Sequence, residues 1–568
     1  MQKFNDLPYS RPSKGESKKL IQTSKKMLKN AKTPEETHAA YLKLSEAIVE
    51  PYTAQTLAHI RSTLNTKDAF YAKESRSANL NLAMVMKQVA GVMKLVFTSP
   101  LRKDIEEKFG AQTLRYREAM LKNSGMSTLL LSMKEGSLVA KQRKLAASCS
   151  VEFAGNTCSY YDLLKLMQSE DREVRRGAFD ALESFCEKAA PEMDKIYDEL
   201  LKVRIKKAKK LGYQSYIDYA YASKMRFDYS PEDTAKFREQ IHKHIVPIYK
   251  EIAEAQRKRL DVEKLMFYDE PVYYKDGNPK LTGGTEQVIA AMGKAFDEMS
   301  PETGEFFRFL KEYELFDLEA RPDKQLGGYA LLLLKHKAPF IMSNFNGTSD
   351  DVLVMTHEGG HAFQVYYSSR RQELLEYIVS TSEINEIHAM SMELLAYPWM
   401  EEFFGSDDDK YRAMHLARRL YSILYHMCVD EFQEEIYKDP GMTAEQRRLL
   451  WKKVEKKYVP WCDYGGSGHF ESGASWMLHQ HIFLSPFYII EYSLAQICAY
   501  QYYLRSLEDR DSAWADYLRL CAAGGSKGYF ELLQEGNLKN PFDDGVVEEV
   551  ANAVKALIHK EDSHAKLV

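Results

Sequence analysis

The eight residues 356–363 constrain the fold of this chain more than any other stretch. They read Thr-His-Glu-Gly-Gly-His-Ala-Phe and contain the pattern His-Glu-x-x-His. Residues four apart lie on one face of a helix, so His357 and His361 can both reach a single ion only if this segment is helical. Glu358 lies about 100° further round the helix, where its carboxylate can take a proton from a water molecule at the ion. The pattern therefore predicts a helix that carries a catalytic zinc site.

The flanking residues also favour a helix. Asn346-Gly347 is a turn signal, and Thr348, Ser349 or Asp350 can serve as the N-cap. Apolar or small residues then recur at helical spacing, at Val352, Met355, Gly359 and Phe363. Gly359 and Gly360 each cost roughly 1 kcal/mol inside a helix. Their presence predicts a close neighbour, either a packed helix or the backbone of a bound ligand.

A catalytic zinc needs a third protein ligand beside two histidines. Ser380 followed by Glu383 fits a capping box, which would give Glu383 a structural role. Helical geometry then favours Glu386 as the third ligand, although spacing alone leaves Glu383 open. Glu393, two turns further along the same side, is a candidate to support a ligand. The remaining acids of this region are Glu373 and Glu376.

A second group of candidates lies downstream at His481, Tyr488 and Tyr492. Ser485-Pro486 predicts a helix start that would place the two tyrosines on one face. Imidazole and phenol groups are suitable hydrogen-bond donors to an oxyanion. The alternative is that these tyrosines pack in a core with their hydroxyls in water. The glycine-rich stretch 464–469 lacks the spacing and lysine of a phosphate loop, and we expect a mobile loop there.

Composition excludes several classes of partner. The 568 residues carry 78 basic and 82 acidic side chains, which is unlike the basic footprint of a nucleic-acid-binding protein. The N-terminal residues have no apolar core of a signal peptide, and no apolar run approaches the length of a membrane span. Seven scattered cysteines without a Cys-x-x-Cys pair indicate reduced thiols. These features predict a cytoplasmic protein, and they do not indicate an oligomeric state.

Most of the chain has the pattern of long amphipathic helices, with clear starts at Thr33-Pro34, Ser230-Pro231, Ser300-Pro301 and Thr443. Strand patterns occur at 270–274, 329–334 and 338–345. Pro339 cannot donate to a ladder and suits an edge strand, to which an extended substrate could add. We therefore predict a mainly α fold with one small β-sheet next to the His-Glu-x-x-His helix. We divide it into an N-terminal helical lobe, 1–195, and a catalytic region, 196–568.

Together these motifs resemble the thimet oligopeptidase and oligoendopeptidase F family of zinc peptidases, and most of all its shorter Pz-peptidase-like bacterial members. The similarity is carried by the Gly327-Gly328-Tyr329 start, the segments 340–347 and 383–393, and the residues from His481 to Tyr492. The resemblance implies a two-lobed helical ellipsoid with a deep channel. Gln364 departs from the histidine that many members have at this position, which puts local hydrogen bonding in doubt.

The resemblance implies one Zn²⁺ per chain, held by His357, His361 and Glu386, with Glu358 as the general base. It further implies that His481 and a tyrosine, Tyr492 or else Tyr488, stabilise the tetrahedral intermediate. The expected activity is hydrolysis of internal bonds in short oligopeptides. The alternatives are a zinc carboxypeptidase or dipeptidase on a similar fold, a non-catalytic peptide-binding protein, and a helical scaffold whose motif is accidental.

Overall fold

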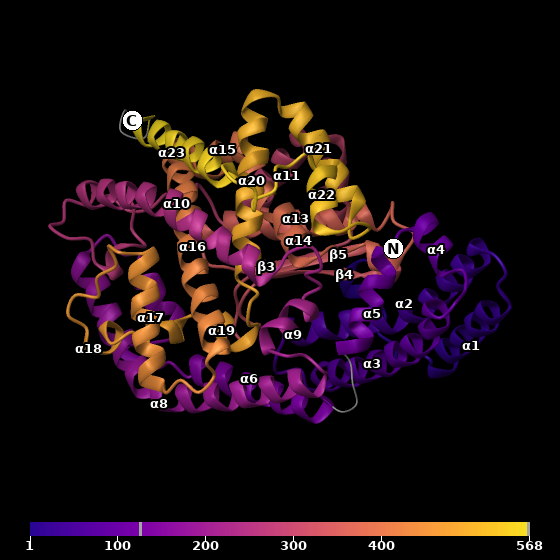
Figure 1. The fold of residues 1–568 in the computed structure, drawn as a ribbon. Helices are drawn as coiled ribbons and strands as arrows, with labels where there is room; N and C mark the ends of the chain where they lie inside the picture. The colour runs from indigo at the N-terminus through magenta and orange to yellow at the C-terminus, as the bar shows by residue number, and fades with distance from the viewer. Residues whose placement is uncertain (124–127, 565–568) are drawn as a thin grey trace. The chain divides into compact units, whose positions relative to one another are not determined.

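The computed structural model describes residues 1–123 and 128–564 and is mainly helical (Figure 1). The chain forms two compact units. Unit 1 comprises 1–121, 280–405 and 498–539, and unit 2 comprises 122–279, 406–497 and 540–568. Each unit is assembled from separated stretches of the chain. The units therefore do not coincide with the predicted segments 1–195 and 196–568. The division into an N-terminal lobe and a catalytic region stays a prediction.

The helices of unit 1 are α1 (Lys14–Asn30), α2 (Pro34–Leu64), α3 (Ala69–Phe97), α4 (Arg102–Phe109), α5 (Gln112–Asn123), α11 (Thr285–Met299), α12 (Pro301–Glu312), α13 (Asp350–Ser368), α14 (Ser382–Leu395), α15 (Met400–Phe404), α21 (Arg510–Ala523) and α22 (Tyr529–Glu535). Those of unit 2 are α6 (Leu129–Ala147), α7 (Tyr160–Leu166), α8 (Arg172–Lys210), α9 (Tyr216–Ser223), α10 (Pro231–Arg259), α16 (Asp408–Lys438), α17 (Ala444–Tyr458), α18 (Gly468–Glu471), α19 (Gln480–Leu484) and α23 (Val546–His564). Helix α20 (Ile490–Glu508) belongs to both.

The predicted helix starts are confirmed, because each is fixed by local chemistry. The side chains of Thr33, Ser230, Ser300 and Thr443 accept hydrogen bonds from backbone N–H groups in the first turn of α2, α10, α12 and α17. Each of these bonds satisfies a donor that has no partner within its own helix.

The sheet of unit 1 has the strand order β3-β5-β4, with β3 (Phe316–Glu319), β4 (Tyr329–Leu333) and β5 (Ala338–Phe345). Strand β5 is parallel to β3 and antiparallel to β4, and is thus the central strand. The prediction that Pro339 marks an edge strand is wrong. Pairing with β3 begins only at Ile341, so the missing N–H of Pro339 falls outside that ladder.

Two other strand predictions need correction. The segment 270–274 is not a strand, because side chains hold its backbone: the amide of Gln256 donates to the carbonyls of Glu270 and Val272. A second sheet that we did not predict is formed by β1 (Val151–Phe153) and β2 (Asn156–Cys158), which pair antiparallel around Gly155. The small sheet next to α13 is confirmed.

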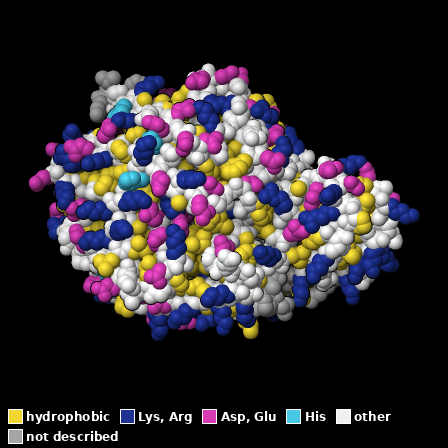
Figure 2. Space-filling view, viewed as in Figure 1, with side chains coloured by type: hydrophobic (Ala, Val, Ile, Leu, Met, Phe, Trp, Pro, Cys, Tyr) yellow, Lys and Arg dark blue, Asp and Glu magenta, His cyan; other side chains and the backbone are white. Residues whose placement is uncertain are grey.

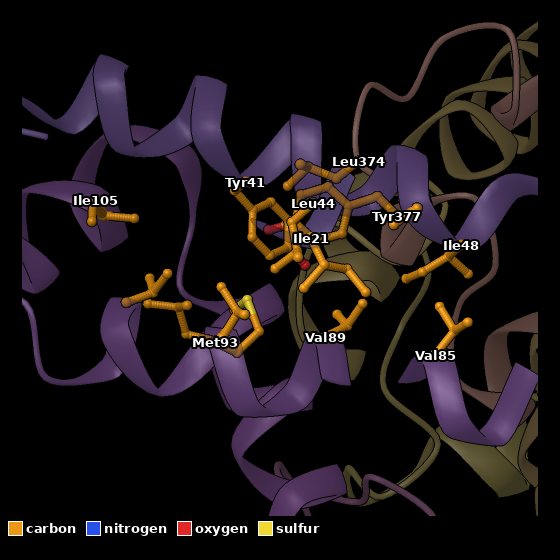
Figure 3. Close-up of a cluster of buried hydrophobic side chains, with 14 residues drawn as sticks. Ile21, Tyr41, Leu44, Ile48, Val85, Val89, Met93, Ile105, Leu374 and Tyr377 are labelled. Carbon is orange, nitrogen blue, oxygen red and sulfur yellow. The ribbon is translucent and has the colours of Figure 1, made fainter. Parts of the chain in front are cut away.

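The N-terminal helices share a buried core in unit 1. Figure 3 shows Ile21 of α1, Leu44 of α2 and Val89 of α3 meeting Leu374 and Tyr377, two residues that come shortly after α13. Beside them the Tyr41 hydroxyl donates to Glu376 Oε1 at 2.6 Å, and the buried Arg117 guanidinium pairs with the same carboxylate. The helices before residue 122 thus brace the segment that links the two helices of the predicted zinc site.

Helix α3 is, among the described residues, the one helix long and apolar enough to cross a membrane by length and composition. One face of α3 lies in the core of Figure 3, whereas Phe70, Leu80 and Met84 are exposed. The expectation that no membrane is involved therefore stays a prediction. Figure 2 shows basic and acidic side chains intermixed over the visible face, in line with the balanced composition.

Candidate active site

Helix α13 carries the His-Glu-x-x-His motif as predicted. Its N-cap is Ser349, which makes no side-chain capping bond. The preceding turn is held instead by the Asp351 carboxylate, which accepts the N–H groups of Asn346 at 3.0 Å and Gly347 at 2.8 Å. The helix therefore begins where the sequence indicates, although the residue that stabilises its start is in the first turn.

The two glycines of the motif allow α14 to approach α13 closely. A Cβ atom on Gly360 would lie 2.7 Å from Ala389 Cα and 2.8 Å from the His388 carbonyl oxygen. A Cβ on Gly359 would lie 3.3 Å from the ring of Phe296. The predicted close neighbour is thus a packed helix at Gly360.

The approach of α14 brings Glu386 to the two motif histidines. Nε2 of His357 lies 3.4 Å from Glu386 Oε2, and Nε2 of His361 lies 3.6 Å from the same oxygen. One ligand atom from each of the three residues lies within 4.8 Å of the other two. The structure therefore assembles the three predicted ligands, and it leaves Glu383 outside this cluster.

The predicted capping box between Ser380 and Glu383 does not form. Helix α14 begins after Thr381, and the Ser380 backbone is bound by Asn385: its N–H donates to Asn385 Oδ1 and its carbonyl accepts from Asn385 Nδ2, both at 3.2 Å. Glu383 is buried in the first turn of α14 and does not form a capping box with Ser380. The preference for Glu386 rests on the geometry of the cluster instead.

Glu393 supports His357 from the opposite side. Its Oε1 lies 2.7 Å from His357 Nδ1. This pairing fixes Nδ1–H as the donor and leaves Nε2 directed at Glu386. Burial disfavours the imidazolium, but the hydrogen bond and the charge of Glu393 outweigh it and raise the pKa of His357 to about 9. Burial and the neighbouring His357 lower the pKa of His361.

Glu358 is almost fully buried beside this cluster. The pKa of Glu358 is raised to about 7, mainly by burial and to a smaller extent by the charge of Glu386. His357 and a hydrogen bond from the Ala330 backbone act in the opposite direction and lower this pKa. A Cβ atom on Gly328 would lie 3.5 Å from Glu358 Oε1. Strand β4 thus passes directly alongside the predicted general base.

Gln364, the departure from the family pattern, is buried and hydrogen-bonded. Its Nε2 donates to the Ile378 carbonyl at 2.9 Å and to Ser368 Oγ at 3.2 Å. The Gln364 amide therefore ties α13 to the segment that leads into α14.

In unit 2, His481, Tyr488 and Tyr492 form one cluster. The His481 ring lies 5.9 Å from that of Tyr488 and 6.0 Å from that of Tyr492, and the tyrosine rings are 5.2 Å apart. The predicted helix start at Pro486 is wrong: α20 begins at Ile490, because Phe487 has φ 61°. Tyr488 therefore reaches Tyr492 from an irregular turn.

His426 of α16 belongs to the same cluster, although no sequence pattern predicted it. Its ring lies 5.6 Å from that of Tyr492, and its Nδ1 is 2.9 Å from Ser493 Oγ. His426 and Ser493 are 67 residues apart in the sequence, with α17, α18 and α19 between them, so no spacing pattern connects them. The role of the His481 cluster at an oxyanion stays a prediction.

The glycine-rich stretch is anchored at its end. The Ser467 hydroxyl and the N–H groups of His469 and Phe470 all donate to Glu183 Oε1 of α8. These bonds satisfy the first N–H groups of the short helix α18 with a carboxylate. The residues after Gly466 thus have a defined structural partner.

Comparison with known proteins agrees with this geometry. Residues 4–123 match the peptidase M3 N-terminal domain, and residues 165–283 and 305–552 match peptidase family M3. The chain belongs to peptidase family M3. The predicted resemblance to the oligoendopeptidase F and Pz-peptidase group is likewise confirmed by individual relatives.

Two of the similar solved structures each cover 99% of this chain. Pz peptidase A with an inhibitor is 39% identical with a TM-score of 0.92, over 99% of this chain and 100% of that one. A putative oligoendopeptidase F from Bacillus anthracis is 37% identical with a TM-score of 0.88, over 99% of both chains.

Among curated relatives, the chromosomal oligoendopeptidase F of Lactococcus lactis subsp. cremoris is 26% identical over 64% of this chain. The chain spans 59% of the length of that relative. Oligopeptidase PepF of Bacillus subtilis is 22% identical over 85% of this chain and 74% of its own length.

Proposed function

We propose that the chain is a zinc-dependent endopeptidase that cleaves internal bonds of short oligopeptides. The observation that carries the proposal is the cluster of His357, His361 and Glu386, whose ligand atoms lie within 4.8 Å of one another. Membership of family M3 and the full-length similarity to Pz peptidase A support the same activity.

The residues present fit one zinc ion. Two bonds of about 2.0–2.1 Å at a tetrahedral angle place their donor atoms roughly 3.3–3.4 Å apart. The Nε2–Oε2 distances of 3.4 and 3.6 Å come close to this spacing. Two imidazoles and one carboxylate are also a known ligand set of catalytic zinc. When bound there, zinc would polarise the scissile carbonyl and make an attacking water more acidic.

The side chains around this site supply the proton transfers. Glu358 would take the proton of the attacking water and deliver it to the leaving amine. The backbone hydrogen bond from Ala330 holds the Glu358 carboxylate on the side of the cluster that faces β4. Glu393 would keep Nε2 of His357 available as a ligand by holding the proton on Nδ1.

The substrate backbone would extend along β4 rather than β5. Strand β5 is paired on both sides, so it cannot accept a further strand, whereas β4 is an edge of the three-stranded sheet. Backbone hydrogen bonds along an edge strand give affinity with little dependence on side chains. This arrangement would suit an enzyme that acts on varied short peptides.

His481, Tyr492 and Tyr488 would donate hydrogen bonds to the tetrahedral oxyanion, as the family resemblance implies. The mutual contacts of the three rings support a shared role. The two-lobed ellipsoid with its deep channel, the cytoplasmic location and the limit on peptide length are further parts of this proposal. They derive from the resemblance and from the sequence.

The test is to map cleavage products of peptides of increasing length by mass spectrometry, with zinc content measured on the same preparation. We expect internal cleavage, about one zinc per chain, and loss of cleavage with a chelator. Release of single C-terminal residues or of dipeptides only would favour the carboxypeptidase or dipeptidase alternative. Zinc binding without cleavage would favour a peptide-binding protein, and absence of zinc would overturn the site.

A further inference from the structure

A cavity of about 460 Å³ lies within unit 2. One wall is a single face of α16, formed by Arg418, Tyr421, Ser422 and Tyr425 at helical spacing. The other walls come from α7, from the segment 267–273 and from His479. The volume lies in the range of small-molecule sites, which is about 300–1,000 Å³.

Glu270 is the one acidic side chain among the residues that line this cavity. The Tyr421 hydroxyl donates to its Oε2. The bonds from Gln256 to the carbonyls of Glu270 and Val272 hold the backbone that carries it. The carboxyl group is therefore fixed in place by side chains of α10 and α16, and it does not depend on a ligand for its position.

The charged neighbours that shift the pKa of Glu270 are negative, and Arg418 is the one cation among the residues that line the cavity. Burial raises the pKa of Glu270 to about 8; the bond from Tyr421 lowers the pKa, and Glu455 and Asp269 raise it again. The other titratable neighbours, Tyr249, Tyr273, Tyr421 and Cys462, have raised pKa values and are neutral at pH 7. A cation that entered the cavity would therefore stabilise the ionised form of Glu270.

Aromatic rings surround the same space. Tyr421 and Tyr425 lie 5.1 Å apart at 76°, and Tyr425 lies 5.3 Å from the ring of His479. Tyr273 and Phe267 also line the cavity. A carboxyl group surrounded by tyrosine rings is suited to bind a ligand that joins an ammonium group to an apolar group.

We propose that this cavity, here called the amine pocket, binds a small organic amine, with its ammonium group against Glu270 and its apolar body on the tyrosine rings. The amine could be a free amine or the N-terminal amine of a short peptide, because both present the same group. All lining residues belong to unit 2, and none is a predicted zinc ligand. The proposal therefore does not rest on the proposed peptidase activity.

The first experiment is isothermal titration calorimetry on the full chain with three probes of similar shape. Phenethylamine carries the ammonium group, 2-phenylethanol is neutral, and 3-phenylpropionate is an anion that could instead pair with Arg418. We expect phenethylamine to bind at least about tenfold more tightly than either of the others. Equal binding of the neutral probe, or preference for the anion, would overturn the proposal. Phenylalanyl-phenylalanine amide then tests whether a peptide N-terminus is accepted as well as a free amine.

Variants locate the binding in this cavity. Glu270→Gln keeps the shape and the bond to Tyr421 but removes the charge, and it should weaken phenethylamine binding at least about tenfold. Ser422→Phe should fill the cavity from α16 and abolish binding while Glu270 remains. Glu254→Gln makes the same chemical change on the exposed side of α10 and should have no effect. Unchanged affinity in both cavity variants, with normal thermal unfolding, would overturn the proposal.

A proton count gives an independent measurement. With a pKa of about 8, Glu270 is mostly protonated at pH 7 when the pocket is empty. Binding of an ammonium group would convert it to the carboxylate, so close to one proton should be released per amine bound. Titrations in two buffers of different ionisation enthalpy measure this release. Proton release that persists in Glu270→Gln would show that another group titrates and would contradict the proposed contact.

Discussion

Glu393 Oε1 lies 2.7 Å from Nδ1 of His357, on the side of the imidazole away from Glu386. Glu393 and Glu386 are both on α14, so one helix supplies a predicted zinc ligand and also orients another ligand on α13. The close approach of the two helices at Gly360 makes this arrangement possible.

This relationship predicts the effect of Glu393→Gln. The amide can still contact Nδ1, but it loses the charge that favours Nδ1–H, and zinc affinity should fall about 10–100-fold. Competition with a metal-binding dye measures the affinity. Glu373→Gln, an exposed acid of the same region, is the control and should bind zinc normally. Wild-type affinity of Glu393→Gln would show that the contact does not tune the site.

The third ligand is tested by Glu386→Ala against Glu383→Ala. Loss of a ligand should lower zinc affinity by more than the factor expected for Glu393→Gln, because no other described carboxylate belongs to the cluster. Glu383→Ala should retain stoichiometric zinc. Metal analysis of both purified variants decides the matter, and an empty site in Glu383→Ala alone would reverse the assignment.

Glu358→Gln should separate catalysis from metal binding. The change removes the proposed base but no ligand, so zinc content should stay near one per chain while kcat falls about 10²–10⁴-fold. Peptide hydrolysis and metal content are measured on one preparation. Wild-type turnover in this variant would place the base elsewhere.

The glycine pair allows a matched stability test. Gly360→Ala should destabilise the fold by about 1–3 kcal/mol, because its Cβ would meet backbone atoms of α14 at 2.7–2.8 Å. Gly359→Ala meets only the Phe296 ring at 3.3 Å and gains helix propensity, so its effect should be smaller. Denaturant unfolding measures both. A more stable Gly360→Ala would contradict the close helix contact.

The tyrosines of unit 2 are tested by kinetics. If Tyr492 donates to an oxyanion, Tyr492→Phe should lower kcat about 10²–10³-fold with KM nearly unchanged and zinc retained. Tyr488→Phe should show this pattern only if that residue is the donor. A role limited to packing would change the melting temperature and leave kcat near the wild-type value. Wild-type kcat in both variants would remove the tyrosines from the mechanism but leave the zinc site in place.

Features that depend on near neighbours in the chain could be predicted from the residues alone. The face shared by His357 and His361 follows from helical geometry. The starts of α2, α10, α12 and α17 follow from a capping side chain that accepts from the N–H three residues further on. The predicted strands at 329–334 and 338–345 were also recognisable, because their hydrophobic pattern is local. The family could be predicted for the same reason, because each of its motifs is a short local string. The family models confirm this prediction.

Two features could be seen only in the folded chain, because contacts between residues far apart in the sequence determine them. Pro339 indicated an edge strand, but β3 pairs with the later part of β5 and makes it central. The residues 270–274 have a strand pattern, but Gln256 binds their carbonyls. In both cases a contact from a more distant part of the chain, which no local pattern reveals, selects the observed structure.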